Sequence, residues 1–105
     1  GGYRIGPAEI EDALVSHAAV AEAAVIGVED QERGQIIKAF VSLSNHGDAS
    51  DRLAEELKQH VKHHLAFFKY PRIIDFVEDF PLTSTGKISR KELRLREKLT
   101  RGGEL

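Results

Sequence analysis

The spacing of hydrophobic and polar residues along the chain predicts a helix, two strands, a helix, a strand, a loop and a helix, in that order. The first helix is expected over residues 7–17, where Ile10, Ala13 and Leu14 recur at helical spacing. Pro7 suits the first helical position, because a proline there loses no internal hydrogen bond. One short amphipathic helix is therefore expected to open the fold.

A pair of strands is expected next. Residues 20–28 are almost wholly apolar, which is typical of a buried strand. A charged turn is predicted over residues 29–34, and a second strand over residues 35–43 should pair antiparallel with the first. These two strands are expected to supply much of the core.

A second amphipathic helix is expected after a polar break at residues 45–48, with Ser50 or Asp51 as its N-cap. Residues 72–77 predict a third strand. The apolar residues of the helix recur every four positions and should lie on the sheet: Leu53, Leu57, Val61 and Leu65.

The last helix is expected over residues 89–98, and residues 100–105 should form a frayed tail. Ser89 and Glu92 have the spacing of a capping box, in which each side chain accepts a hydrogen bond from the other residue's amide. The arginines of this helix should face solvent. The leucines expected to face the core are Leu93 with either Leu95 or Leu99.

These elements predict an α+β domain, with a small antiparallel or mixed sheet of about three strands flanked by about three helices. A chain of 105 residues, 41% hydrophobic and 30% charged, suits one such domain, spanning residues 1–105. The absence of cysteine excludes disulfides and thiolate metal sites. Because methionine is missing even at the first position, we expect a piece of a longer protein. With no membrane-spanning run and no signal peptide, the expected location is the cytoplasm, or an organelle matrix in a eukaryote.

The loop over residues 81–87 places one lysine between a predicted strand and a predicted helix. Pro81 fixes its own backbone angle, and Gly86 allows angles or close approaches that a β-carbon forbids. Lys87 is thus held on a short tether, which suits a cation presented to an anion; the alternative is an ordinary exposed lysine in a turn. A phosphate-binding P-loop is excluded, because Pro81 stands where its first glycine would be and Ile88 follows the lysine.

Charge is unevenly distributed, although the net charge is only −2. Acidic groups predominate in residues 1–33, whereas residues 87–101 are rich in basic ones. A basic end can attract the phosphates of a nucleotide, a coenzyme or a nucleic acid, or it can be a solvated helix face. The negative net charge disfavours a nucleic-acid-binding module. A purely structural or interaction module is a third alternative.

Three histidines lie on the second predicted helix. His60 and His64 are four residues apart and could hold a metal in principle. We predict no metal site, because no third ligand of matching type is nearby and Lys58 and Lys62 would repel a cation. Solvated or capping histidines are the favoured interpretation.

Two segments far apart in the chain resemble the same family. The opening GGYRIGPAEIE and the later KYPRIIDFVEDFPLTSTGKISRKELR are similar to motifs in the C-terminal domain of the adenylate-forming superfamily. That superfamily includes acyl-CoA synthetases, luciferases and the adenylation domains of peptide synthetases. The opening motif looks more like AMP-forming acyl-CoA synthetases of the acetyl or medium-chain type, and an adenylation domain that loads a carrier protein is the alternative.

The resemblance implies the C-terminal lid of a two-step ligase whose large N-terminal domain holds most of the ATP, its Mg²⁺ and the acyl pocket. A carboxylic acid would react with ATP to give an acyl-adenylate, and coenzyme A would then displace AMP. Lys87 matches the family's catalytic lysine, whose charge would stabilise the crowded anions of the first step. In some relatives this lysine is reversibly acetylated, which implies an acetyltransferase and a deacetylase as partners. The isolated chain is expected to fold and to be inactive.

The resemblance also implies that the lid rotates after the first step and presents its opening motif to the same site. Gly2, Tyr3 and Arg4 would then border the tunnel for the pantetheine arm of coenzyme A. Lys62, with Arg72 as another candidate, would contact a phosphate of coenzyme A. The hinge of this rotation would precede the chain.

Overall fold

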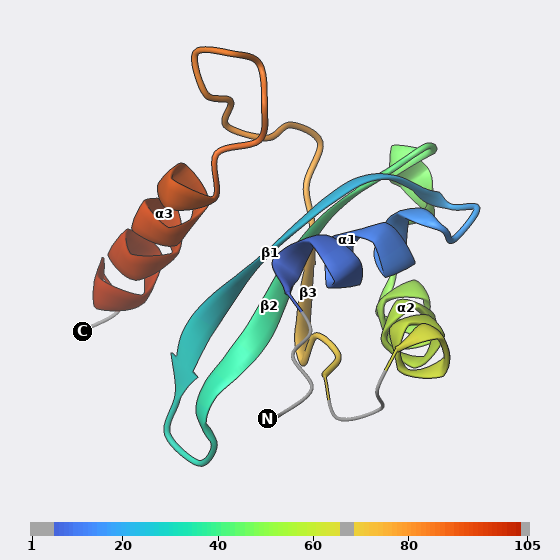
Figure 1. The fold of residues 1–105 in the computed structure, drawn as a ribbon, viewed down its shortest axis with the longest axis horizontal. Helices are drawn as coiled ribbons and strands as arrows, with labels where there is room; N and C mark the ends of the chain where they lie inside the picture. The colour runs from blue at the N-terminus through green and yellow to red at the C-terminus, as the bar shows by residue number, and fades with distance from the viewer. Residues whose placement is uncertain (1–5, 66–68, 104–105) are drawn as a thin grey trace.

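The computed structural model describes residues 6–65 and 69–103, and the helices and strands within them follow the predicted order (Figure 1). The predicted α+β class is confirmed. The elements are α1 (Pro7–Val15), β1 (Val20–Asp30), β2 (Gly34–Leu43), the short 3-10 helix η1 (His46–Asp48), α2 (Asp51–His64), β3 (Ile73–Phe76) and α3 (Arg90–Gly103).

The sheet is mixed, with the strand order β1-β2-β3. β1 pairs antiparallel with β2, and β3 pairs parallel with β2. Ala39 lies at the centre of the sheet, opposite Val25 on one side and Ile74 on the other. A parallel pair needs a long crossover connection, and here the crossover contains α2.

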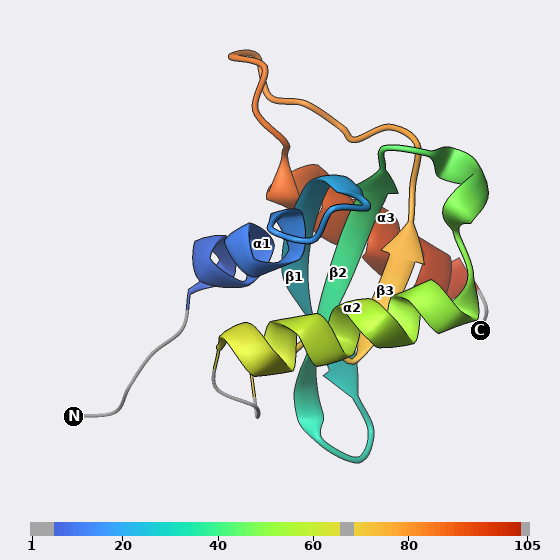
Figure 2. The same cartoon turned by 90° about the vertical axis from the view of Figure 1, so that its right-hand side faces the viewer.

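Helices cover both faces of the sheet (Figure 2). Ala23 and Val25 of β1 pack in a core cluster with α1 and α2, whereas Ala24 and Ile26 pack with Leu93 of α3 in a second cluster. Successive side chains of a strand point to opposite faces, so a strand covered on both faces needs apolar residues at every position. This explains the almost unbroken apolar run of β1.

The first half of the chain differs from the prediction only at element boundaries. α1 ends at Val15 rather than at residue 17, because Ser16 is its C-cap and the His17 imidazole accepts a hydrogen bond from the Ala19 amide. β1 extends to Asp30, because its last residues pair with the start of β2. Gly34, with a φ of 81°, allows the short turn that results.

α2 matches its prediction closely. The hydroxyl of Ser50 accepts a hydrogen bond from the Leu53 amide at 3.0 Å, which makes Ser50 the N-cap. Leu57 and Val61 are fully buried, and Leu53 and Leu65 pack partly buried against the same core cluster. The predicted apolar stripe of this helix is confirmed.

α3 corrects two predictions. It continues to Gly103, so residues 100–103 of the expected tail are helical. Leu93 is 4% exposed, as predicted, but Leu95 and Leu99 are 47% and 74% exposed, so neither joins it in the core. Residues four apart share a helix face, and the residue that shares the face of Leu93 is Glu97.

Glu97 faces the sheet because Lys38 of β2 is buried beneath it. The Lys38 ammonium lies 2.6 Å from the Glu97 carboxylate and 2.9 Å from the carboxylate of Asp75 on β3. Burial by itself lowers the pKa of Lys38, but the hydrogen bonds to Glu97 and Asp75 outweigh it and leave the pKa above its ordinary value of 10.5. α3 is therefore held to the sheet by a charged cluster as well as by Leu93.

Replacing Lys38 with methionine should destabilise the domain by about 3 kcal/mol, because a buried cation that binds two carboxylates, Glu97 and Asp75, would be removed. The contribution of Lys38 is expected to be complete at neutral pH and to vanish as the pH rises through its raised folded-state pKa. Urea denaturation followed by circular dichroism measures both effects. The exposed Lys91→Met is the control, and an equal loss of stability in the two variants would contradict the prediction.

Candidate functional site

Residues 81–89 form a hairpin rather than an open loop. Leu82 and Ile88 pair as an antiparallel bridge, and the Ser89 amide donates a hydrogen bond to the Pro81 carbonyl at 2.8 Å. In Figure 1 this segment extends away from the sheet between β3 and α3. The tether expected from the sequence is thus a preformed structure closed at its base.

Backbone bonds and one hydroxyl fix the peptide of Lys87 inside the hairpin. The Thr83 amide donates to the Lys87 carbonyl at 2.7 Å, and the Lys87 amide donates to the Thr83 hydroxyl at 3.2 Å. The Gly86 amide donates to the Thr83 carbonyl at 3.0 Å. Gly86 has a φ of 87°, so the prediction that it needs backbone angles unfavourable to other residues is confirmed. The role of Thr83 in holding the Lys87 peptide was not predicted, although a hydroxyl four residues before a loop lysine can indicate such a hydrogen bond.

The amide of Ser89 explains why the predicted capping box is only half formed. The Ser89 hydroxyl accepts a hydrogen bond from the Glu92 amide at 3.1 Å, as expected of an N-cap. The Ser89 amide is already used at the base of the hairpin, and the Glu92 carboxylate lies 3.5 Å from Arg96 instead. The hydrogen bond from the Ser89 amide to the Pro81 carbonyl therefore takes the place of the bond to the Glu92 side chain that a complete capping box would contain.

The side chain of Lys87 is exposed, in the arm of the hairpin that leads into α3. Among residues 6–65 and 69–103, no carboxylate lies within ion-pairing distance of its ammonium, and no hydrogen bond to that ammonium is formed. An exposed, unpaired ammonium is accessible to an anion from outside the domain.

A hollow of about 370 Å³ adjoins Lys87, and its charged lining includes Glu11, Glu22 and Arg90. Arg90, the first residue of α3, binds the Glu11 carboxylate through two nitrogens, at 2.9 and 2.5 Å. The Glu11 carboxylate raises the pKa of the Arg90 guanidinium, and burial opposes this. Glu11 also accepts a hydrogen bond from the Val25 amide at 2.9 Å, so one carboxylate joins α1, β1 and α3.

The two predicted contacts for coenzyme A meet at one aromatic ring. The Lys62 ammonium lies 4.2 Å from the centre of the Tyr70 ring, and the Arg72 guanidinium carbon lies 4.6 Å from it. Tyr70 itself packs against the first core cluster. Arg72 precedes β3 and the Lys87 hairpin follows it, so the two candidate sites lie at opposite ends of that strand. The sequence did not predict that Tyr70 brings the two cations together.

The other predicted contacts for coenzyme A, Gly2, Tyr3 and Arg4, lie outside the described residues.

Comparison with known proteins identifies the domain. Residues 9–87 match the family described as the AMP-binding enzyme C-terminal domain. The chain belongs to this family.

Its relatives are acyl-CoA synthetases and ligases. The chain is 55% identical over 98 residues to the human mitochondrial acyl-coenzyme A synthetase ACSM1, covering 91% of this chain and 17% of that protein. It is 54% identical over 96 residues to the uncharacterized acyl-CoA ligase YtcI of Bacillus subtilis, covering 91% and 18%. The crystal structure of the Brucella canis acyl-CoA synthetase superposes with a TM-score of 0.87 and 51% identity, covering 95% of this chain and 18% of that one.

These findings confirm the predicted resemblance. The chain is a C-terminal domain of the type found in AMP-forming acyl-CoA synthetases. It spans less than a fifth of the length of the relatives described above. In the described part of the chain, no helix is both long and apolar enough to cross a membrane.

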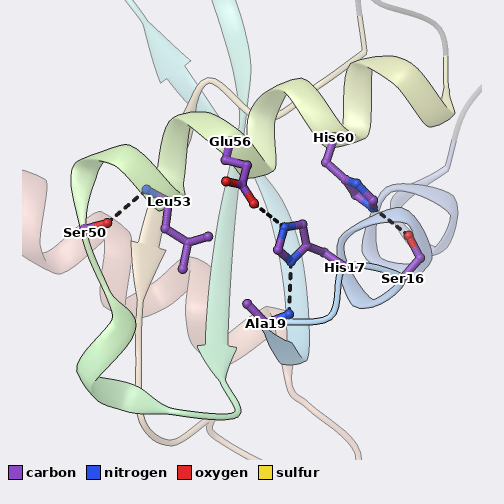
Figure 3. Close-up of polar contacts among 7 residues, drawn as sticks. All are labelled: Ser16, His17, Ala19, Ser50, Leu53, Glu56 and His60. Atoms are coloured by element: carbon purple, nitrogen blue, oxygen red, sulfur yellow. Dashed lines mark hydrogen bonds and ion pairs between the residues drawn. The ribbon is translucent and has the colours of Figure 1, made fainter.

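Two histidines of this AMP-binding C-terminal domain, His17 and His60, connect α1 to α2 (Figure 3). His17 accepts a hydrogen bond from the Ala19 amide at Nδ1, so its Nε2 carries the proton and donates to Glu56 at 2.6 Å. The Ser16 hydroxyl donates to the Ala13 carbonyl, so His60 must donate to the Ser16 oxygen, at 2.8 Å. These bonds join the end of α1 to the middle of α2.

His60 and His64 each make a hydrogen bond within the domain. His64 donates from Nδ1 to the His60 carbonyl at 2.9 Å, while the His60 ring nitrogen is used by Ser16. Burial lowers the pKa of His60, and the neighbouring His64 and His17 lower it further, which favours the neutral ring. Within the described residues, no group of three or more His, Cys, Asp or Glu side chains is arranged to hold a metal ion.

The basic residues at the end of the chain are partly used in internal pairs. Arg90 binds Glu11, so the prediction that the arginines of α3 face solvent is wrong for this one. Arg96 pairs with Glu92 on the surface of α3. Lys91, Arg94 and Lys98 are exposed, as a solvated helix face requires. The last basic residue of the segment 87–101 is Arg101.

Replacing Thr83 with valine should speed hydrogen exchange at the Lys87 amide by about fivefold, because a hydrogen bond worth about 1 kcal/mol would be lost. Valine keeps the branched shape of threonine, so the loss of the hydroxyl is the main change. Exchange can be followed residue by residue by NMR spectroscopy. Ser84→Ala, at an exposed position in the same turn, is the control. Unchanged exchange at Lys87 in Thr83→Val would contradict the role of the hydroxyl.

Proposed function

We propose that Lys87 is the catalytic lysine of an AMP-forming acyl-CoA synthetase and that residues 1–105 are its C-terminal lid domain. The observation that carries this proposal is an exposed ammonium, unpaired among the described residues and held on a preformed hairpin. Family membership adds the chemical context.

The first half-reaction joins two anions that repel each other. The carboxylate oxygen of the acid bonds to the α-phosphorus of ATP, and the bond from that phosphorus to the bridging oxygen of pyrophosphate breaks. Lys87 contributes a fixed positive charge beside the α-phosphoryl oxygens, where negative charge is concentrated in the transition state. It transfers no proton, so its ordinary charge at neutral pH is sufficient. No described side chains of this domain are arranged for a metal, so the large N-terminal domain is assigned the Mg²⁺.

The second half-reaction needs a different surface at the same site. The lid rotates, withdraws Lys87, and presents its opening segment, in which Gly2, Tyr3 and Arg4 border the pantetheine tunnel. The thiol of coenzyme A loses its proton to water and its sulfur bonds to the acyl carbon. The bond from that carbon to the phosphate oxygen of AMP breaks, and AMP leaves with its electron pair. One domain thus serves two reactions in turn.

Lys62 and Arg72 are assigned to a phosphate of coenzyme A. Two cations on one aromatic ring form a compact positive surface, and the ring restricts the movement of both side chains. Their place at the opposite end of β3 from the Lys87 hairpin suits a separate step of the reaction.

Two further assignments follow from the same proposal. Lys87 is also assigned as a substrate of a lysine acetyltransferase and a deacetylase, which its exposure supports, and acetylation would stop the first half-reaction by removing its charge. The cytoplasm, or an organelle matrix in a eukaryote, is the proposed location, and one relative is named as mitochondrial.

Lys87→Ala in the complete synthetase should slow adenylate formation by about 10²- to 10³-fold, because one preorganised charge at the transition state is lost. Thioester formation from supplied acyl-adenylate should stay within a few-fold of the wild type. Pyrophosphate exchange into ATP measures the first reaction, and acyl-CoA production from the adenylate measures the second. Lys91→Ala, another exposed lysine, is the control. Equal loss in both half-reactions would contradict the two-site proposal.

Lys62→Ala and Arg72→Ala should each raise the KM for coenzyme A by about two- to fivefold, the effect of losing one partly screened charge pair. If the lost partner is the 3′-phosphate, the KM for dephospho-coenzyme A should change much less. Steady-state kinetics with both thiols makes this comparison. Lys58→Ala, whose ammonium lies 3.7 Å from Glu55, is the matched control on α2. An equal KM change for both thiols would exclude contact with that phosphate.

A further inference from the structure

The direction in which the Lys87 hairpin points must be set at its base. Residues 82–87 are all exposed, so within the described structure little packing supports them from the side. The hairpin is closed by the bond from Ser89 to Pro81, and Ile88 packs partly buried against the second core cluster. The next residue along the chain is Arg90, which begins α3.

Arg90 is attached to the rest of the domain by a rigid contact. Its guanidinium makes two hydrogen bonds to Glu11, whose side chain is only 13% exposed. A planar guanidinium bound through two nitrogens fixes orientation as well as distance, which a single ion pair does not. Glu11 is itself held by the amide of Val25, at the edge of the sheet.

This contact restrains α3 where its other contacts do not. Leu93 and Glu97 hold the helix along one face, about 6 Å apart on its axis. Arg90 lies on the same face, three residues before Leu93 and seven before Glu97, so it extends this row of contacts to the first residue of the helix. Without it, the first turn could tilt away from the sheet about Leu93 and carry the hairpin with it. Arg90 anchors this end of α3 to α1 and β1 through Glu11, which opposes that tilt.

We propose that Glu11 and Arg90 are positioning residues for Lys87: their bidentate ion pair fixes the base of the hairpin so that the ammonium meets the reacting anions. The effect of the pair is exerted through Lys87, so the inference rests on the catalytic role proposed above. Glu11 ends the opening motif and Arg90 belongs to the lysine motif, 79 residues apart. The two segments that carried the family resemblance are thus in direct contact.

The test uses Arg90→Lys and Glu11→Gln in the complete synthetase. Lysine keeps the charge of Arg90 without its fork, and glutamine keeps an oxygen for the Val25 amide without the negative charge. Each variant should lower kcat for adenylate formation by about 10- to 100-fold, the usual cost of a misplaced reacting group. Thioester formation from supplied acyl-adenylate should change much less. Arg96→Lys, which weakens an exposed pair on the same helix, should leave both half-reactions unchanged.

Combination with Lys87→Ala shows whether the pair acts through the lysine. In that background, Arg90→Lys should produce no further loss of adenylate formation, because there is no ammonium left to position. A further loss of the same size, or a parallel fall of both half-reactions with the melting temperature, would show a purely structural role and overturn the inference. Normal adenylation in Arg90→Lys would also overturn it. Selective loss in Lys87→Ala alone would leave the proposed function intact, whereas normal adenylation in Lys87→Ala would refute that function.

Discussion

The central sheet is apolar on both of its faces, and the rest of the domain is arranged around that constraint. Ala23 and Val25 of β1 require cover on one side, and Ala24 and Ile26 require it on the other. α1 and α2 provide the first layer and α3 provides the second (Figure 2). The hairpin that carries Lys87 must therefore lead from β3 to a helix on the far face of the sheet.

α3 meets this requirement with little apolar surface. In the described part of the helix, Leu93 is the one buried leucine, and Leu95 and Leu99 remain exposed. Two charged contacts complete the attachment, one from Glu97 to Lys38 and one from Arg90 to Glu11. Charged contacts depend on geometry far more than apolar ones do, since a hydrogen-bonded pair fails when its atoms move by an ångström. A helix attached in this way has a well-defined orientation, which a catalytic hairpin at its first turn requires.

Two lysines of the same chain show how the fold decides what a charge can do. Lys38 lies under α3, with two carboxylates around its ammonium, and its charge is used within the domain. Lys87 lies on a hairpin that leaves its ammonium beyond ion-pairing distance of every described carboxylate, and its charge is available to a ligand. The difference depends on where the strands and helices meet, not on the residue itself.

The order of elements, the α+β class, the buried stripe of α2 and the family could be predicted from the chain alone, because each depends on local spacing or on a motif. For Gly86 the chain left open whether a backbone angle or a close approach requires glycine, and the structure shows the angle. The sequence did not determine that Glu97 rather than Leu95 or Leu99 accompanies Leu93, since Lys38 is 59 residues away in the chain. Nor did it determine the Glu11–Arg90 contact or the meeting of Lys62 and Arg72 on Tyr70. Those contacts arise only when helices on both faces of one sheet bring distant segments together, and no local pattern of residues encodes such distances.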